Sequence, residues 1–252
     1  MPAARTCLVA GASRGIGATV AEALARDGHR LALLARDTDA LAQVRARLGA
    51  PGLIVPADVT DPRQVDAAFE RVEAEWGPVE VLVCNAGAGF AAPLVETTDA
   101  DWARMLELNL TAPFQLIRRA IPAMTAAGWG RIVVIASVVA KRGEAQVAAY
   151  TAAKHGVLGL VRAAAAELAR TGVTVNAICP GYVDTPMTEA TVEAIAARSE
   201  RTPEQARQTL ARRQPIGRLI DPAEVAQAVR FCVENAAVTG QGINVDGGTV
   251  QS

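Results

Sequence analysis

Tyr150 and Lys154 stand four residues apart in a stretch that favours a helix. On a helix, this spacing puts both side chains on one face. A phenol has an ordinary pKa of ~10, and a neighbouring ammonium favours the phenolate, so the pair predicts an acid/base group with a lowered pKa. The chain holds only two tyrosines, and its only lysines are Lys141 and Lys154. Coincidence therefore explains the pair poorly, although chance is an adequate explanation for Lys141.

Ser137 directly follows the apolar run Arg131–Ala136. If that run is a strand, the Ser137 hydroxyl lies at its carboxyl end, where it could hydrogen-bond a substrate oxygen. Ser137, Tyr150 and Lys154 are thus the candidate catalytic residues that follow from residue type and spacing.

A glycine-rich turn follows the first apolar run and comprises Gly11, Ala12, Ser13, Arg14, Gly15, Ile16 and Gly17. Glycines permit a tight turn and let backbone N–H groups approach a pyrophosphate at the positive end of the next helix. The spacing is G-x-x-x-G-x-G, which differs from the G-x-G-x-x-G dinucleotide fingerprint. Its place between a strand and a helix still favours nucleotide binding over a purely structural turn.

The end of the second apolar run indicates which nucleotide is bound. An acidic residue there would accept hydrogen bonds from the ribose of NAD, whereas an arginine would bind the 2′-phosphate of NADP. The chain has Arg36 at this point, and Arg14 is a second cation in the glycine-rich turn. Asp37 would oppose a phosphate if it turned inward, but it could equally cap the following helix. The expected cofactor is NADP(H), with NAD(H) as the alternative.

Seven short apolar runs alternate with longer amphipathic stretches. They are apolar continuously, which is typical of parallel strands covered on both faces. Helices are expected at Gly15–Asp27 and after two Asp-Pro pairs, at Asp61–Trp76 and Asp221–Glu234. The pattern predicts an α/β fold over residues 1–252: one single-domain, doubly wound (Rossmann-type) parallel seven-stranded sheet with helices on both faces. The expected strands are Thr6–Ala10, Arg30–Ala35, Leu53–Ala57, Val79–Cys84, Arg131–Ala136, Val173–Ile178 and Gly242–Val245.

Composition excludes several classes of protein. A net charge of -1 and a charged fraction of 20% give no basic excess for nucleic acid. No apolar stretch approaches the ~18–20 residues that span a bilayer, and the first residues show no signal-peptide pattern. The four cysteines are widely spaced and indicate buried, reduced thiols rather than disulfides or a metal site, so a cytoplasmic location is expected.

Taken together, these motifs resemble the short-chain dehydrogenase/reductase family over nearly the whole chain. The resemblance implies that Asp58 with Val59 contacts the adenine, that Asn85 to Gly87 shapes the nucleotide pocket, and that Pro180 to Thr185 lies beside the nicotinamide. The expected cofactor-binding residues are Gly11, Ser13, Arg14, Gly15, Ile16, Gly17, Arg36, Asp58, Val59, Asn85, Ala86, Gly87, Tyr150, Lys154, Pro180, Gly181, Val183 and Thr185. The expected catalytic residues are Asn109, Ser137, Tyr150 and Lys154, and no metal is expected.

The resemblance also implies a mechanism. Tyr150 would donate a proton to a carbonyl oxygen while hydride arrives from the nicotinamide, and Ser137 would orient that oxygen. Lys154 would lower the Tyr150 pKa and hold the nicotinamide ribose, and Asn109 would support a proton-relay water. Two supporting positions depart from the family pattern, since Ala10 replaces a threonine and Cys84 an asparagine.

Residues 186–215 correspond to the substrate lid of the family. The lid carries five arginines that could bind the phosphates of coenzyme A or phosphopantetheine, or that simply form a solvated face balanced by glutamates. The segments Arg213–Arg218 and Ser137–Val139 resemble 3-oxoacyl ketoreductases of fatty-acid and polyketide synthesis. The carrier-docking arginines of the fatty-acid branch fall on Gly128 and Thr171, with Arg131 and Arg170 close by, which leaves a CoA thioester or a free ketone open.

The expected function is NADP(H)-dependent reduction of a ketone to a secondary alcohol, the ketone being a 3-oxoacyl thioester or related β-keto compound. The first alternative is an NAD-dependent catabolic dehydrogenase of a hydroxyacyl-CoA or secondary alcohol. A remote alternative is a non-catalytic nucleotide-sensing protein. The resemblance further implies a homotetramer formed through the helices around Trp102–Ala127 and Tyr150–Arg170, and neither a nucleic-acid nor a membrane partner is expected.

Overall fold

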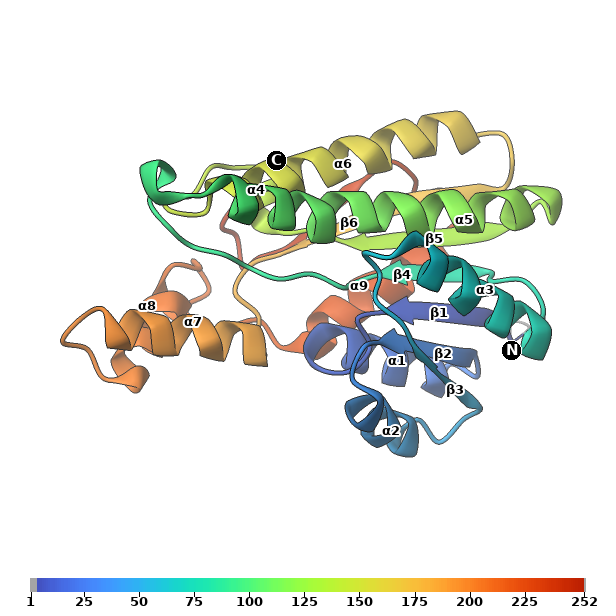
Figure 1. Cartoon of the computed structure of the whole chain (residues 1–252), viewed down its shortest axis with the longest axis horizontal. Coiled ribbons are helices and arrows are strands. Elements are labelled where there is room, and N and C mark those ends of the chain that lie inside the picture. Colours follow the sequence, from blue (N-terminus) through green and yellow to red (C-terminus); the bar gives the residue numbers. More distant parts are fainter. Residues whose placement is uncertain (1–3, 252) are drawn as a thin grey trace.

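The computed structural model of the chain describes residues 4–251. Their strands form one parallel sheet in the order β3-β2-β1-β4-β5-β6-β7, so the sheet runs outward in both directions from the β1–β4 pair (Figure 1). The strands are β1 (Thr6–Ala10), β2 (Arg30–Ala35), β3 (Gly52–Pro56), β4 (Val81–Cys84), β5 (Gly130–Ile135), β6 (Val173–Pro180) and β7 (Gly242–Val245). The predicted fold class, a doubly wound parallel seven-stranded sheet, is confirmed.

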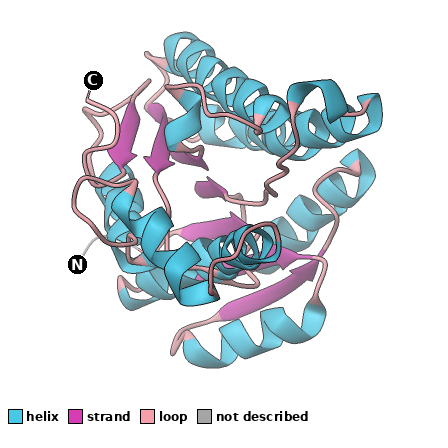
Figure 2. Cartoon of the chain, turned by 90° about the vertical axis from the view of Figure 1, so that its left-hand side faces the viewer, coloured by secondary structure: helices cyan, strands magenta, loops and turns pink. Residues whose placement is uncertain are grey.

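Helices cover both faces of the sheet (Figure 2). One apolar core lies between the sheet and helices α3, α5 and α6, and a second lies between the sheet and helices α1, α2 and α9. The helices are α1 (Gly15–Arg26), α2 (Thr38–Arg47), α3 (Pro62–Trp76), α4 (Asp99–Leu106), α5 (Ala112–Ala126), α6 (Ala148–Leu168), α7 (Pro186–Ala197), α8 (Pro203–Arg212) and α9 (Pro222–Glu234). Short helical turns lie at η1 (Leu94–Glu96), η2 (Glu107–Thr111) and η3 (Val138–Ala140).

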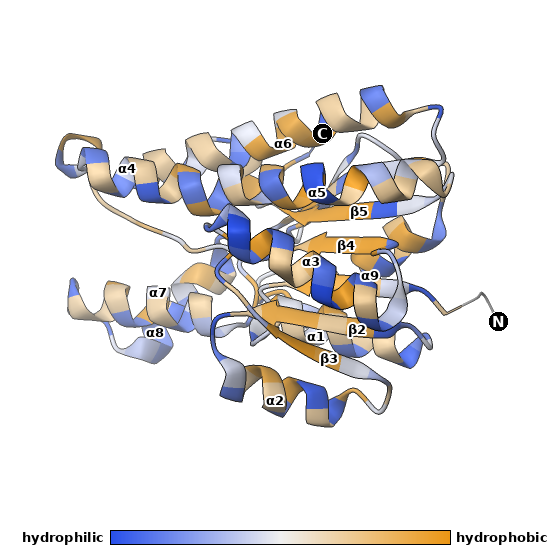
Figure 3. Cartoon of the chain, turned by 45° about the vertical axis from the view of Figure 1, so that its right-hand side comes forward, coloured by the Kyte–Doolittle hydropathy of each residue, from blue (hydrophilic) through white to orange (hydrophobic). Residues whose placement is uncertain are grey.

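Strand ends differ from the predicted ones by one or two residues where pairing, rather than hydropathy, decides them. Val79 is buried, yet β4 begins only at Val81, because residues from Val81 onward pair with β1. β6 continues to Pro180, two residues beyond the predicted end, because Cys179 and Pro180 pair with the edge strand β7. Figure 3 shows the strands as the hydrophobic middle layer, which is why the apolar runs mark them well.

Three helices begin as the sequence predicts: α1 begins at Gly15, and α3 and α9 each begin after an aspartate. Asp61 and Asp221 are the N-caps of α3 and α9, and each accepts a hydrogen bond from the backbone of the first turn. The four cysteines are buried and unpaired. Within residues 4–251, no helix is both long and apolar enough to cross a membrane, and no cluster of three or more acidic, cysteine or histidine side chains could hold a metal ion.

Helices α7 and α8 extend from the carboxyl ends of the strands, away from the two main layers (Figure 1). They pack on each other through a small apolar cluster of Val192, Ala206 and Leu210. They lie within residues 186–215, the segment predicted to be a substrate lid and called the lid below. Their apolar cluster is separate from the two main cores, so they form a distinct element beyond the strand ends.

Candidate active site

Most of the candidate site segments follow the carboxyl end of a strand, whereas Asn109, Tyr150 and Lys154 lie on helical segments. In an open parallel sheet, ligands bind in the crevice outside those ends, at the point where the strand order reverses. Here that point lies between β1 and β4. The topology therefore brings together the glycine-rich turn after β1, Asn85 after β4 and Ser137 after β5, although they are far apart in the sequence.

The glycine-rich turn packs tightly against the segment after β4. Gly11 has a φ of 78°, and a Cβ there would lie 2.6 Å from the backbone nitrogen of Ala86. A Cβ on Gly17 would collide with the Gly11 carbonyl oxygen, which accepts a 2.9 Å hydrogen bond from Asn85 Nδ2. The first and third glycines are therefore required for the close approach of two backbone segments.

The amino end of α1 offers unsatisfied donors to a ligand. Its N-cap is Arg14, which makes no side-chain capping bond, and its first turn holds no acidic residue. The starts of α5, α6 and α7 also lack a side-chain cap, so α1 is distinguished by the glycine-rich turn that precedes its uncapped start. An uncapped helix start behind a glycine turn is suited to a pyrophosphate, because its free N–H groups and the helix dipole both favour an anion.

Arg36 is an exposed cation at the predicted adenosine end of the cleft. The side chain of Arg36 is 81% exposed, and its nearest ion-pair partner within the described chain is Asp58 at 3.7 Å. Asp37 does not face the cleft, since its carboxylate caps α2 by accepting from the Ala40 backbone N–H. Hydrogen bonds from Thr60 hold the pKa of Asp58 below its usual range. The capping alternative for Asp37 is confirmed, and the cleft keeps a cation able to reach a phosphate.

Tyr150 and Ser137 meet at the carboxyl end of β5. Ser137 is the N-cap of η3, and its hydroxyl accepts from the Val139 backbone N–H at 3.3 Å. Tyr150 lies in the first turn of α6 and shares a hydrogen bond with Ser137. Burial raises the pKa of Tyr150 to about 12, with the Ser137 hydrogen bond acting in the opposite direction. The phenol is therefore a neutral proton donor at neutral pH.

Lys154 lies one helical turn beyond Tyr150 and is buried. Its Nζ donates to the Ile135 carbonyl oxygen at 2.9 Å and lies 5.6 Å from the centre of the Tyr150 ring. Burial lowers the pKa of Lys154 to about 8. The predicted lowering of the Tyr150 pKa is wrong for this structure, because the desolvation of the phenol dominates and Lys154 bonds a backbone carbonyl.

Asn109 is fully buried at the centre of the π-helical turn η2. Its Nδ2 donates to the carbonyl oxygens of Ala88 and Met105, both at 3.1 Å, whereas its Oδ1 has no partner. A Cβ placed on Gly87 would lie 2.9 Å from that Oδ1 and 3.9 Å from Lys154 Nζ. The orphaned acceptor therefore opens toward Gly87, in the neighbourhood of the Lys154 ammonium.

The segment after β6 borders both the glycine turn and the lid. A Cβ on Gly15 would lie 3.3 Å from the Thr185 side chain, so the two predicted cofactor segments face each other. Gly181 donates to the Val245 carbonyl oxygen at 3.0 Å, and Val183 is buried and bridges to Ile220. Thr185 is the N-cap of α7. The glycine-rich turn and the segment from Pro180 to Thr185 thus lie side by side at the carboxyl ends of the strands.

Two arginines of the lid form ion pairs with different parts of the chain. Arg207 pairs with Asp184 and Glu189, and Arg213 pairs with Glu144, a residue outside the lid. Arg131, considered as a carrier-docking cation, is buried and donates to backbone carbonyl oxygens of Val233, Gly130 and Gly172. It is a structural residue, and the docking alternative loses that support.

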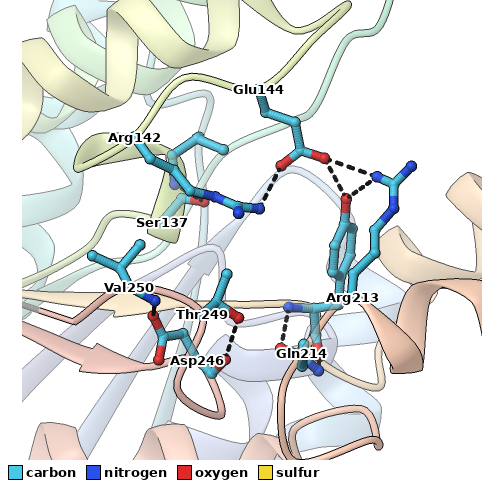
Figure 4. A network of polar contacts seen from close by, with 10 residues as sticks. Ser137, Arg142, Glu144, Arg213, Gln214, Asp246, Thr249 and Val250 are labelled. Carbon is cyan, nitrogen blue, oxygen red and sulfur yellow. Dashed lines mark hydrogen bonds and ion pairs between the residues drawn. The ribbon is translucent and has the colours of Figure 1, made fainter.

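Sequence reasoning missed a polar cluster beside the site, shown in Figure 4. It consists of Arg142, Glu144, Tyr182 and Arg213, and it is called the Glu144 cluster below. Lys141 was also underestimated, since its ammonium donates to the Gly242 carbonyl oxygen and so fixes β7. The sequence does not predict these contacts, because Glu144 lies 38 positions from Tyr182 and 69 from Arg213, and Lys141 lies 101 positions from Gly242.

A family model described as enoyl-(acyl carrier protein) reductase matches residues 11–250, which is almost the whole chain. The chain belongs to the short-chain dehydrogenase/reductase family. It is an oxidoreductase of that family, and the predicted resemblance is confirmed.

Named relatives cover almost the whole length of both chains. The chain is 41% identical to a granaticin polyketide synthase ketoacyl reductase of Streptomyces violaceoruber, over 96% of this chain and 91% of that protein. It is also 41% identical to cis-4-hydroxycyclohexanecarboxylate dehydrogenase of Sinomonas cyclohexanicum, over 98% and 96% of the two chains. A crystal structure of a variant actinorhodin polyketide ketoreductase with NADPH matches with a TM-score of 0.94 at 39% identity, covering 98% of this chain and 97% of that one.

Proposed function

We propose that the chain is an NADPH-dependent ketoreductase that converts a 3-oxoacyl thioester or related β-keto compound to the secondary alcohol. The observation that carries the proposal is the meeting of Ser137, Tyr150 and Lys154 at the carboxyl end of β5, beside the glycine-rich turn. Ketoacyl reductase and ketoreductase relatives of nearly equal length support it.

The residues of the cleft fit a dinucleotide. Gly11 and Gly17 let the turn lie close to neighbouring backbone. The start of α1 behind this turn has no capping side chain, so its backbone N–H groups can bind a pyrophosphate. Arg14 and Arg36 are exposed cations suited to a 2′-phosphate, and Asp37 is occupied as a cap. When bound, the nicotinamide supplies the hydride that reduces the carbonyl carbon.

The protein side of the reaction is proton transfer and positioning. Tyr150, neutral at pH 7, donates its phenolic proton to the carbonyl oxygen, and Ser137 hydrogen-bonds the same oxygen. The Lys154 ammonium stabilises the phenolate that results and holds the nicotinamide ribose. The orphaned Oδ1 of Asn109 can bind a water that resupplies the proton through Lys154.

A second candidate function is the oxidation of a secondary alcohol with NAD. The similarity to cis-4-hydroxycyclohexanecarboxylate dehydrogenase favours it. The same side chains would serve, with Tyr150 as base. The exposed Arg36 in place of an acidic residue argues for NADPH.

One experiment separates these functions. Absorbance of NADPH and NADH is followed with a panel of β-keto thioesters, β-keto esters and simple ketones, and the reverse reaction is followed with hydroxy compounds. The proposal expects the highest kcat/KM for a β-keto compound with NADPH. A clear preference for NADH with an alcohol would establish the second function instead.

We further infer that residues 1–252 form a single domain with a substrate lid at residues 186–215. We also infer that the enzyme acts in the cytoplasm and assembles as a homotetramer. Exposed Trp102 on α4 and Phe114 on α5 support an interface there, and four unpaired cysteines support a reducing compartment.

A further inference from the structure

Glu144 is the centre of a group of converging donors. Its Oε1 accepts from the Tyr182 hydroxyl at 2.7 Å and from Arg213 Nη1 at 3.0 Å, and its Oε2 accepts from Arg142 Nη2 at 3.2 Å. The Glu144 side chain is only 19% exposed. Burial and the carboxylate itself raise the pKa of Tyr182, which keeps that phenol a donor. Two guanidinium groups and one phenol therefore hold a single carboxylate.

The cluster joins two parts of the site that no other described side-chain ion pair joins. Arg142 and Glu144 belong to residues 141–147, the segment between Ser137 and Tyr150. Tyr182 follows β6, and Arg213 is the C-cap of α8 at the end of the lid. Figure 4 shows Ser137 and Arg142 on one side of Glu144 and Arg213 on the other. The contact thus crosses from the catalytic segment to the base of the lid.

Tyr182 is fixed at both ends. Gln214 is buried, and its side chain accepts from the Tyr182 backbone N–H at 2.9 Å and donates to the Tyr182 carbonyl at 3.2 Å. The phenol oxygen is held by Glu144 and also accepts from Arg213 at 3.1 Å. The backbone is fixed by Gln214, and the ring, which packs against the apolar cluster of α7 and α8, is held at its hydroxyl by Glu144 and Arg213.

The segment that carries Glu144 is itself held in place. Gln146 has a φ of 67°, a left-handed conformation that is costly for a side chain other than glycine. Its carbonyl oxygen accepts from the Ala92 backbone N–H at 2.8 Å, which ties the segment to the loop after β4. The segment that presents the Glu144 carboxylate is therefore tied by its backbone to the loop after β4, whereas Arg213 reaches it from the end of the lid.

We propose that Glu144 is a specificity-determining positioning residue, which holds Tyr182 and the lid base closed across the substrate entrance. The inference rests on the proposed ketone reduction, since it concerns the same cleft. With the contact in place the entrance accepts a compact β-keto compound and disfavours a bulky ring system. Glu144 acts through Tyr182 and Arg213 and takes no part in proton or hydride transfer.

The test compares the full-length wild type with Glu144→Gln, Tyr182→Phe and the control Glu200→Gln, which changes an exposed lid carboxylate outside the cluster. Each protein is assayed with NADPH on ethyl 3-oxobutanoate and on 1-decalone, a fused bicyclic ketone. Hydrogen exchange of residues 182–217 is measured in parallel. We expect the ratio of kcat/KM for the bicyclic to the compact ketone to rise about fivefold in both cluster variants, together with faster lid exchange.

The inference is overturned if Glu144→Gln changes neither the ratio of kcat/KM for the two ketones nor the hydrogen exchange of the lid. It is also overturned if lid exchange becomes faster while that ratio stays the same. A change in selectivity without faster exchange also overturns it, because Glu144 would then act on the substrate directly. Tyr182→Phe decides the matter if Glu144→Gln fails to fold. If the wild type reduces neither ketone, the proposed function fails, while unchanged lid exchange would separately refute the contact.

Discussion

Tyr150 has a pKa that differs from the lowered value predicted from its spacing to Lys154. Burial raises the pKa of the phenol to about 12 and lowers that of the ammonium to about 8. Residue type and spacing correctly predicted that the two side chains share a helix face near Ser137. They could not predict desolvation, because burial depends on how α6 packs against the sheet. For reduction, the result is favourable, since the reaction consumes the proton that a neutral phenol carries.

The Lys154 pKa predicts how the rate depends on pH. Tyr150 stays protonated across the neutral range, but Lys154 loses its charge as the pH rises through about 8. We expect kcat/KM for ketone reduction to fall on the alkaline side of that value, because an uncharged amine no longer stabilises the phenolate. The measurement is a pH profile of kcat/KM with NADPH in excess. His155→Gln, an exposed neighbour, should leave the profile unchanged, and a profile flat to pH ~10 would contradict the assignment.

Arg36 predicts the choice of nucleotide. Replacing it with leucine removes a cation suited to the 2′-phosphate, so Arg36→Leu should lower kcat/KM for NADPH by about tenfold and leave that for NADH nearly unchanged. The control is Arg63→Leu, which removes another exposed cation, in the first turn of α3. Equal losses with both nucleotides would show that Arg36 does not select between them.

At the scale of elements, hydropathy and capping residues predicted most of the sheet and several helix starts. β1, β2 and β7 have the predicted bounds, because their apolar runs coincide with the paired residues. The π-helical turn at Glu107–Thr111 could not be predicted, since it is one extra residue in a helical pattern. That turn places Asn109 inside the site. The Glu144 cluster was also beyond prediction, because lid and catalytic segment meet only in the folded chain.

The turn between β1 and α1 gives a prediction for its glycines. A methyl group on Gly17 would collide with the Gly11 carbonyl oxygen, so Gly17→Ala should weaken NADPH binding by about tenfold or more. Gly159→Ala is the matched control, because a Cβ there meets nothing within 4 Å. Binding is measured by nucleotide fluorescence on the purified proteins. If Gly17→Ala bound NADPH as tightly as Gly159→Ala, the glycine turn would not be the pyrophosphate site.

At the scale of the whole molecule, one apolar core lies on each face of the sheet, and the candidate catalytic residues lie near the carboxyl ends of its strands. The doubly wound parallel sheet could be predicted from the alternation of apolar runs and amphipathic stretches, but subunit contacts could not, because they involve surfaces that a single chain leaves exposed. Phe114 is 41% exposed on α5 and Trp102 is 42% exposed on α4. Exposed aromatic side chains on these two helices favour burial against another copy.

This surface predicts the oligomeric state. The wild type should elute as a particle of about four times 26.2 kDa in light scattering, and Phe114→Asp should shift it toward smaller species. Circular dichroism checks that the variant remains folded. A wild type that scatters as a monomer at all concentrations would refute the tetramer.

The central claim is that Tyr150 supplies the proton for carbonyl reduction, and Tyr150→Phe tests it most directly. The variant removes one oxygen atom and keeps the ring that packs beside Lys154. With NADPH and the best β-keto substrate of the panel, kcat should fall by ~10²–10⁴-fold. Binding of NADPH, followed by its fluorescence, should stay close to that of the wild type. A Tyr150→Phe enzyme that binds NADPH and keeps the turnover of the wild type would contradict the account.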